Sequence, residues 1–148
     1  MYKRILVAVD GSSTSDLALQ EAVKLAGESQ AELRLVHVVN TVNLNVDLGY
    51  VATAEWLEVI RRGGEAVVDK AAAYARQAGV NAEVKLVEID TIGQRVPEAI
   101  AEEASAWPAD IIVIGTHGRQ GIHHLLMGSV AEGVMRIATV PVLLIRGK

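Results

Sequence analysis

Short apolar segments alternate with segments of helical periodicity along the whole chain, and this alternation limits the fold more than any other feature. The apolar run at 5–9 is uninterrupted, which is typical of a strand covered on both faces. Strands are predicted at 5–9, 33–39, 82–89, 110–115 and 140–146, and helices at 17–28, 54–78, 97–107 and 129–138. Strands that alternate with helices pair in parallel through right-handed crossovers. The sequence therefore predicts an α/β fold with one domain, 1–148, in which helices cover both faces of an open five-stranded parallel sheet.

Composition excludes several classes of protein. The 148 residues fit one domain, and 51% are hydrophobic, enough to bury a core. A net charge of −4 argues against a sequence-independent nucleic-acid binder, although backbone amides can still hold a small anion. The lack of cysteine rules out disulfides, thiolate metal sites and cysteine nucleophiles. The apolar run near the start is too short for a signal peptide or a membrane span, so we expect a cytoplasmic protein without membrane insertion.

Two segments interrupt the regular pattern. The stretch 40–53 is polar, β-branched and aperiodic, and a loop of that length is often a lid or a binding segment. Gly63 and Gly64 interrupt the long helical segment, and each is expected to weaken it by roughly 1 kcal/mol relative to alanine.

The glycine-rich stretch GTHGRQGIHHLLMGS, at 115–129, follows the fourth predicted strand. In an open parallel sheet it meets the loop after the first strand at the carboxyl edge, where ligands bind. Gly118 and Gly121 permit positive φ and a close approach of backbone to ligand. Gly128 precedes a helix whose first amides, with the helix dipole, form an anion site. The alternative is that Ser129 and Glu132 form a capping box that only starts the helix.

The spacing of these glycines is specific. Gly115, two residues, Gly118, nine residues, Gly128 and Ser129 resemble the ATP-binding signature of the universal stress protein family. The segments KRILVAVDGS, LVHVV, ADIIVIGTHG and LLMGSVAEGVMRIATVPVLLIR are similar to the family's strands and closing helix, so that the resemblance covers nearly the whole chain. A Walker A motif and the paired-glycine dinucleotide fingerprint are both absent from the sequence.

The resemblance implies a Rossmann-like domain that dimerises and binds ATP or AMP, with Mg²⁺ compatible with ATP. It implies that Ala8 and Val9 line the base pocket, that the Val38 backbone meets the adenine edge, and that Asp10 lies near the ribose or the metal–phosphate region. The other implied contacts surround the ribose and phosphates: Gly115, His117, Gly118, Arg119, Gly121, and the amides of Gly128, Ser129 and Val130, with the Ser129 hydroxyl. For Asp10 the alternative is a helix-terminal charge or an Asx turn, and for Arg119 it is a solvated loop side chain.

Two further features concern histidine and the last strand. His123 and His124 are adjacent, so on a regular element they point apart, and no third metal ligand is evident. His37, inside the second strand, is expected to be a satisfied core or edge histidine. The last strand, from Val140 to Ile145, is apolar and β-branched, and a bare sheet edge of this kind is hazardous. Since the family pairs two chains through this strand, we expect a symmetric homodimer, the alternative being a monomer with a covered edge.

The predicted function is an adenine-nucleotide-binding regulatory or stress-response module, with room for an unidentified protein partner. No base is poised for phosphoryl transfer, so at most we expect slow ATP hydrolysis or self-phosphorylation, as in some relatives. One alternative is a dimeric adaptor that has lost nucleotide binding. Another alternative is a phospho-receiver domain using Asp10, Asp90 and Thr116, which needs an acidic pair after the first strand and a lysine after the last, whereas here Gly11 follows Asp10 and the chain closes RGK. A flavodoxin-like carrier is disfavoured because flavin rings usually stack on aromatic side chains, and this chain has no Phe and only five aromatic residues.

Overall fold

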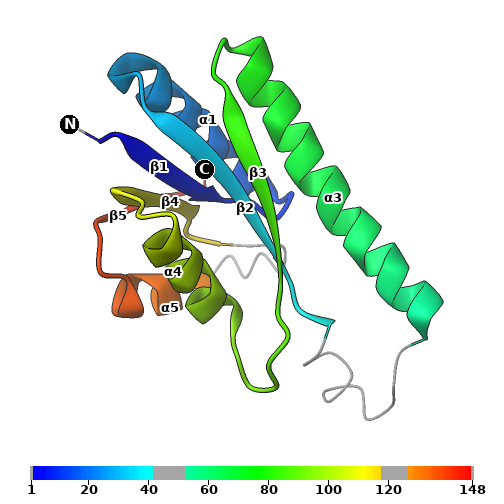
Figure 1. The fold of residues 1–148 in the computed structure, drawn as a ribbon. Helices are drawn as coiled ribbons and strands as arrows, with labels where there is room; N and C mark the ends of the chain where they lie inside the picture. The colour runs from blue at the N-terminus through cyan, green and yellow to red at the C-terminus, as the bar shows by residue number, and fades with distance from the viewer. Residues whose placement is uncertain (1, 42–52, 118–126, 148) are drawn as a thin grey trace.

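The computed structural model describes residues 2–41, 53–117 and 127–147. Its five strands and four long helices alternate in the predicted order (Figure 1). The elements are β1 (Arg4–Ala8), α1 (Ser13–Ser29), β2 (Glu32–Val39), α3 (Ala54–Gln77), β3 (Ala82–Glu88), α4 (Val96–Ala106), β4 (Ile111–Gly115), α5 (Ser129–Ile137) and β5 (Val142–Ile145). The predicted α/β class and five-stranded sheet are therefore confirmed.

All four strand pairings are parallel, and the strand order is β3-β2-β1-β4-β5. The chain builds outward from β1 in one direction and then returns to its other side with β4, so the order reverses between β1 and β4. Such a reversal opens a crevice at the carboxyl edge, because the connections on either side leave in opposite directions.

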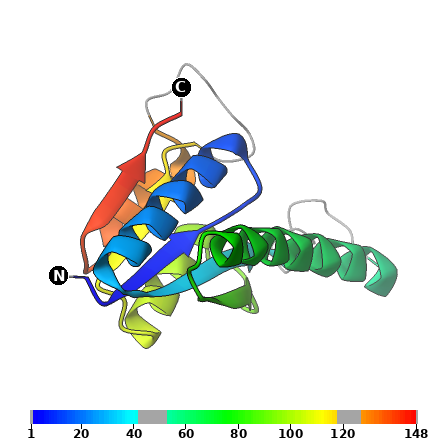
Figure 2. The same ribbon diagram turned by 90° about the horizontal axis from the view of Figure 1, so that it is seen from above.

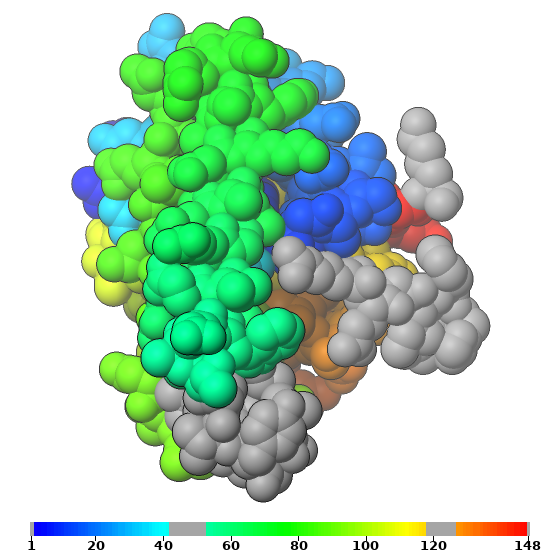
Figure 3. Space-filling view, turned by 90° about the vertical axis from the view of Figure 1, so that its right-hand side faces the viewer, coloured from blue at the N-terminus to red at the C-terminus, as the bar shows by residue number. Residues whose placement is uncertain are grey.

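Two clusters of buried hydrophobic side chains pack the helices against the two faces of the sheet. One joins α1 and α3 to the face that carries Ile5, Val7 and Leu35. The other joins α4 and α5 to the opposite face, which carries Leu6 and Ile112. Seen from above, the two helix layers lie on either side of the sheet, and α3 extends beyond it (Figure 2). The space-filling view shows α3 and α1 side by side on one side of the molecule (Figure 3).

The side chains and backbone conformation at its two ends set the boundaries of α1, which differ from the predicted ones. The helix α1 begins at Ser13, earlier than predicted, because the Ser12 side chain caps it by accepting a hydrogen bond from the Ser15 amide at 3.2 Å. It ends through Gln30, which adopts a left-handed conformation with φ 53°.

The glycine pair does not interrupt α3, which is continuous from Ala54 to Gln77. A Cβ added to Gly64 would lie 2.8 Å from Leu86 Cδ1 and 2.9 Å from Val39 Cγ2. The absence of a side chain at Gly64 therefore lets the helix approach β2 and β3 closely. Within the described ranges, no helix is long and apolar enough to cross a membrane.

Candidate functional site

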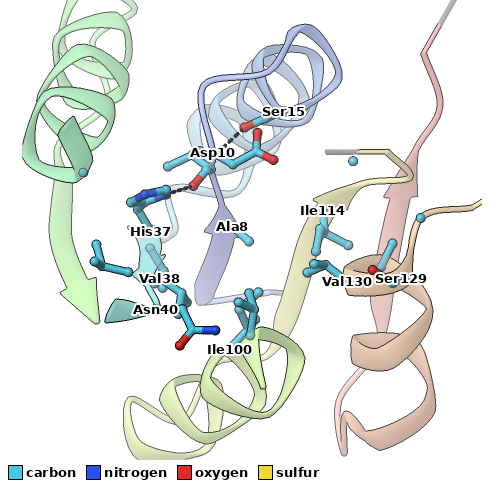
Figure 4. A pocket seen from close by; sticks show the side chains of 18 of the residues that line it. Ala8, Asp10, Ser15, His37, Val38, Asn40, Ile100, Ile114, Ser129 and Val130 are labelled. Carbon is cyan, nitrogen blue, oxygen red and sulfur yellow. Dashed lines mark hydrogen bonds between the residues drawn. The ribbon is translucent and has the colours of Figure 1, made fainter. Parts of the chain in front are cut away.

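A cavity of about 620 Å³ opens at the carboxyl edge of the sheet, where β1 and β4 diverge (Figure 4). Its size is ordinary for a small-molecule site. Nine of the twelve residues that the sequence predicted as ligand contacts line it: Ala8, Val9, Asp10, Val38, Gly115, His117, Gly128, Ser129 and Val130. The other three, Gly118, Arg119 and Gly121, lie outside the described residues.

The end of β1 places Asp10 at the rim of the cavity (Figure 4). Its Oδ1 accepts a hydrogen bond from the Ser12 amide at 2.9 Å, and its own amide donates to Ser15 Oγ at 3.0 Å. This is the Asx turn that the sequence left as the alternative reading, and Gly11 follows with φ 83°. A carboxylate has four acceptor sites, so the turn and a ligand contact are compatible.

The backbone of Val38 faces the cavity from β2. The Val36 carbonyl accepts from the Val9 amide at 2.8 Å, whereas the Val39 carbonyl accepts from the Ile89 amide at 2.9 Å on the β3 side. Because backbone groups alternate along a strand, the N–H and C=O of Val38 point to the β1 side. The pairing between β1 and β2 ends at Ala8 and Val36, so Val38 lies beyond the last pair, at the opening.

The end of β4 is held close to the first turn of α1. A Cβ on Gly115 would lie 2.8 Å from Thr14 Cγ2 and 3.1 Å from the Thr14 backbone, so this glycine is needed for close packing. The sequence had assigned it to a sharp exit from the strand. Beyond it, the Thr116 amide donates to the Ile145 carbonyl at 2.9 Å, and Thr116 Oγ1 lies 3.1 Å from His117 Nδ1.

The first turn of α5 forms another wall of the cavity. Gly128 occupies the N-cap position with φ −75° and ψ 167°, and no side chain from the described part of the chain caps the helix. The alternative interpretation of Ser129 and Glu132 as a capping box is therefore wrong: Ser129 is the first helical residue, and Glu132 instead accepts from Arg136 at 2.7 Å. The amides of the first three helical residues have no partner within the helix. By contrast, α1 and α3 are capped by the side chains of Ser12 and Thr53.

Several lining residues were missed by the sequence analysis. Val96 and Ile100 of α4 form an apolar wall, and Ile60 and Gly63 approach from α3. Asn40, at the end of β2, also lines the cavity. Apolar periodicity marked the α4 segment only as a helix, because the pattern does not distinguish a core contact from a cavity wall.

His37 lines the cavity beside the end of β1, where the sequence predicted a satisfied core or edge histidine. Its Nδ1 lies 2.7 Å from the Val9 carbonyl oxygen, so this nitrogen carries a proton and donates. The bond links β2 to β1 beyond their last ladder pair. His37 therefore has a hydrogen-bond partner, as predicted, and this bond also holds two residues of the cavity lining, His37 and Val9, together.

A charged cluster fixes the chain just after β2. Arg61 of α3 donates to both carboxylate oxygens of Glu88, at 2.9–3.1 Å, and the buried Thr41 hydroxyl donates to the same carboxylate at 3.2 Å. The hydrogen bond from Arg61 is the main reason that the pKa of Glu88 is lowered. No group of three or more histidine or carboxylate side chains that could hold a metal occurs in the part of the chain that the structure describes.

A parallel sheet with a cavity at the point where its strand order reverses is typical of doubly wound α/β proteins, a class in which ligands bind at that point. The universal stress protein family matches residues 1–146, and the chain belongs to that family. A universal stress protein of Bacillus subtilis is 34% identical over 153 residues, covering 99% of this chain and all of the relative. One of Methanocaldococcus jannaschii is 33% identical over 150 residues, covering 99% and 83%.

Solved structures agree with this assignment. A family member from Burkholderia pseudomallei is 35% identical, with a TM-score of 0.77 over 97% of this chain and 96% of that one. A universal stress protein from Archaeoglobus fulgidus in complex with dAMP is 26% identical, with a TM-score of 0.70 and coverage of 97% and 98%. One in complex with cAMP is 25% identical, with a TM-score of 0.72 and coverage of 97% of each chain.

Asp90 tests the phospho-receiver alternative. It lies beyond the end of β3, at the far side of the sheet, where its Oδ1 accepts from Thr91 Oγ1 at 3.1 Å. It does not line the cavity with Asp10 and Thr116, so the three residues that a receiver would need are not brought together. The family membership is the stronger argument against this alternative.

Proposed function

We propose that the cavity binds an adenine nucleotide, ATP or AMP, and that the protein is a regulatory module of the stress response. One observation carries the proposal. The outward backbone pair of Val38 and the uncapped first turn of α5 face the same cavity from opposite sides. The first suits the edge of a base and the second suits phosphate.

The base would lie between β2 and α4. The side chains of Ala8, Val96, Ile100 and Val130 make this part of the cavity apolar. The N–H and C=O of Val38 are a donor and an acceptor side by side, which matches N1 and the 6-amino group of adenine. Burial of an aromatic base here removes apolar surface from water, and the backbone pair fixes its orientation.

The phosphates would lie at the start of α5. Its amides and the positive end of its dipole favour an anion, and among the described residues no side chain caps this helix. Gly118, Arg119 and Gly121 remain proposed contacts. Asp10 would accept from a ribose hydroxyl or from metal-bound water. A single carboxylate with substrate phosphates is a usual environment for Mg²⁺, so Mg²⁺ fits an ATP complex here.

The family members solved with dAMP and with cAMP support an adenine ligand, since they share this fold over nearly their whole length. Catalysis is not part of the proposal beyond slow ATP hydrolysis or self-phosphorylation at Ser12, Ser13 or Ser129. The cytoplasmic location stays a prediction from the sequence.

The assembly we propose is a homodimer through the segment from Val140 to Ile145. The strand β5 is an edge of the sheet, so one side of its backbone is available for pairing with a second copy. Leu143 on this strand is exposed, as are Met135 and Ile137 on α5. Leu143 lies on the α1 side of the sheet, like its ladder partner Val113, whereas α5 covers the other face, so exposed apolar side chains flank the edge on both faces.

Thermal unfolding with added nucleotide tests the proposal. At a concentration of one hundred times its Kd, a ligand that binds only the folded state stabilises it by about 2.7 kcal/mol. For a chain of 148 residues this corresponds to a rise in Tm of roughly 9 °C. No shift with ATP, ADP or AMP, with or without Mg²⁺, would overturn the proposal and favour the dimeric adaptor.

A further inference from the structure

The backbone of Val38 alone does not separate adenine from guanine. Adenine presents an acceptor at N1 beside a donor at its 6-amino group. Guanine presents a donor at N1 beside an acceptor at O6. The same N–H and C=O accept guanine when its ring is turned over, with O6 at the N–H and N1–H at the C=O. A site selective for adenine therefore needs a further polar group.

Asn40 is such a group. It is the residue directly after β2 and follows Val38 by two residues. It is half-buried and lines the cavity. Figure 4 shows its amide directed into the space between β2 and α4, beside Ile100. It also lines the groove between the start of α4 and α5, so it stands where the base end of the cavity opens outward.

The chain is held on both sides of Asn40. Before it, the Val39 carbonyl accepts from the Ile89 amide at 2.9 Å. After it, the buried Thr41 hydroxyl donates a hydrogen bond to Glu88, which also accepts hydrogen bonds from the Arg61 guanidinium. Both contacts hold the backbone around Asn40 against the end of β3. A side chain that starts from a fixed backbone loses little further freedom on binding a ligand, which favours selective recognition.

We propose that Asn40 selects adenine over guanine and hypoxanthine by reading the 6-position and N7 of the base. The inference rests on the proposed nucleotide site. Along β2 the order is the N–H of Val38, its C=O and then the Asn40 amide, which matches the order N1, 6-amino group and N7 along adenine. The amide oxygen accepts from the amino group while the amide nitrogen donates to N7. Guanine or hypoxanthine bound to the same backbone pair places its C2 edge at Asn40 instead, so the contact to N7 is lost.

Calorimetric titration with ATP, 7-deaza-ATP, ITP and GTP tests this assignment. We expect the wild type to bind ATP more tightly than GTP and ITP by roughly ten-fold or more. We expect 7-deaza-ATP, which lacks only the N7 acceptor, to bind roughly two- to ten-fold more weakly than ATP. Leucine is similar in size to asparagine but has no amide. In Asn40→Leu we therefore expect the affinity ratios of ATP over GTP and ITP, and of ATP over 7-deaza-ATP, to fall toward one. In Thr41→Val we expect the same affinity ratios to decrease, because the residue after Asn40 loses its hydrogen bond to Glu88.

Asn81→Leu is the matched control. Asn81 is exposed and precedes β3 at the opposite edge of the sheet, so this variant keeps the wild-type ratios. If the wild type and Asn40→Leu bind ATP with equal ratios over 7-deaza-ATP and ITP, the assignment of Asn40 is wrong while the nucleotide site stands. If the wild type binds none of the four nucleotides, the nucleotide site and the assignment both fail.

Discussion

Replacing Ser129 with proline removes one backbone N–H from the proposed phosphate site without breaking the helix. Ser129 is the first residue of α5, where proline is favoured and the amide has no partner within the helix. Gly128 has φ −75° and ψ 167°, an extended conformation that a residue before proline adopts readily. We therefore expect the free energy of unfolding without ligand to change by less than about 0.5 kcal/mol.

Ligand affinity, in contrast, should fall sharply in Ser129→Pro. The hydrogen bond from the amide to a charged phosphate contributes about 1.5–3 kcal/mol, so the Kd for ATP should be roughly ten- to 150-fold weaker in Ser129→Pro than in Ser129→Ala, which keeps the amide. Ser129→Ala is the matched control, since it removes only the hydroxyl and leaves the amide. Its loss should be about 0.5–1.5 kcal/mol, or roughly two- to ten-fold.

Isothermal titration calorimetry of the two variants, with thermal unfolding to verify the fold, measures the difference. Because both variants lack the hydroxyl, their ratio isolates the amide. Equal affinities for ATP in Ser129→Pro and Ser129→Ala would refute the argument that the first turn of α5 holds phosphate.

Three further predictions concern the packing, the electrostatics and the assembly. Gly64→Ala should destabilise the fold by about 1–3 kcal/mol in urea unfolding, because its Cβ would lie 2.8 Å from the nearest side-chain atom. Gly63→Ala, with open space around its Cβ, should stabilise α3, and equal effects at the two positions would contradict the packing argument. Since Arg61 lowers the pKa of Glu88, their pairing stabilises the fold at neutral pH and is lost as the pH falls through the folded-state pKa. The stability difference between the wild type and Arg61→Met should shrink on acidification, and a difference that grows would refute this. If the proposed homodimer forms, Leu143→Lys should convert it to monomers in sedimentation velocity, whereas a monomeric wild type would exclude the dimer.

The arrangement of the sheet was predictable from sequence because the strands are short and their periodicity differs from that of the helices. The run at 5–9 shows no polar alternation, which signals burial on both faces, and burial of β1 is what the structure has. The boundary of α1 was less predictable. Whether Ser12 ends a turn or caps a helix depends on its backbone angles, and the sequence leaves both open.

The cavity was predictable where it is built from the ends of strands. Asp10, Val38 and Gly115 lie together because parallel strands end at one edge of the sheet. Asn40 and Ile100 were not predicted, since their contribution depends on how α4 lies against β2. The role of Gly64 was likewise hidden, because a close helix–sheet approach involves residues distant in sequence.

The location of a bound nucleotide tests the central claim most directly. In a crystal structure of the protein saturated with ATP, we expect the adenine edge at the Val38 backbone and phosphate oxygens within hydrogen-bonding distance of the Ser129 and Val130 amides. A nucleotide bound elsewhere on the molecule, or phosphates held away from the first turn of α5, would contradict the account.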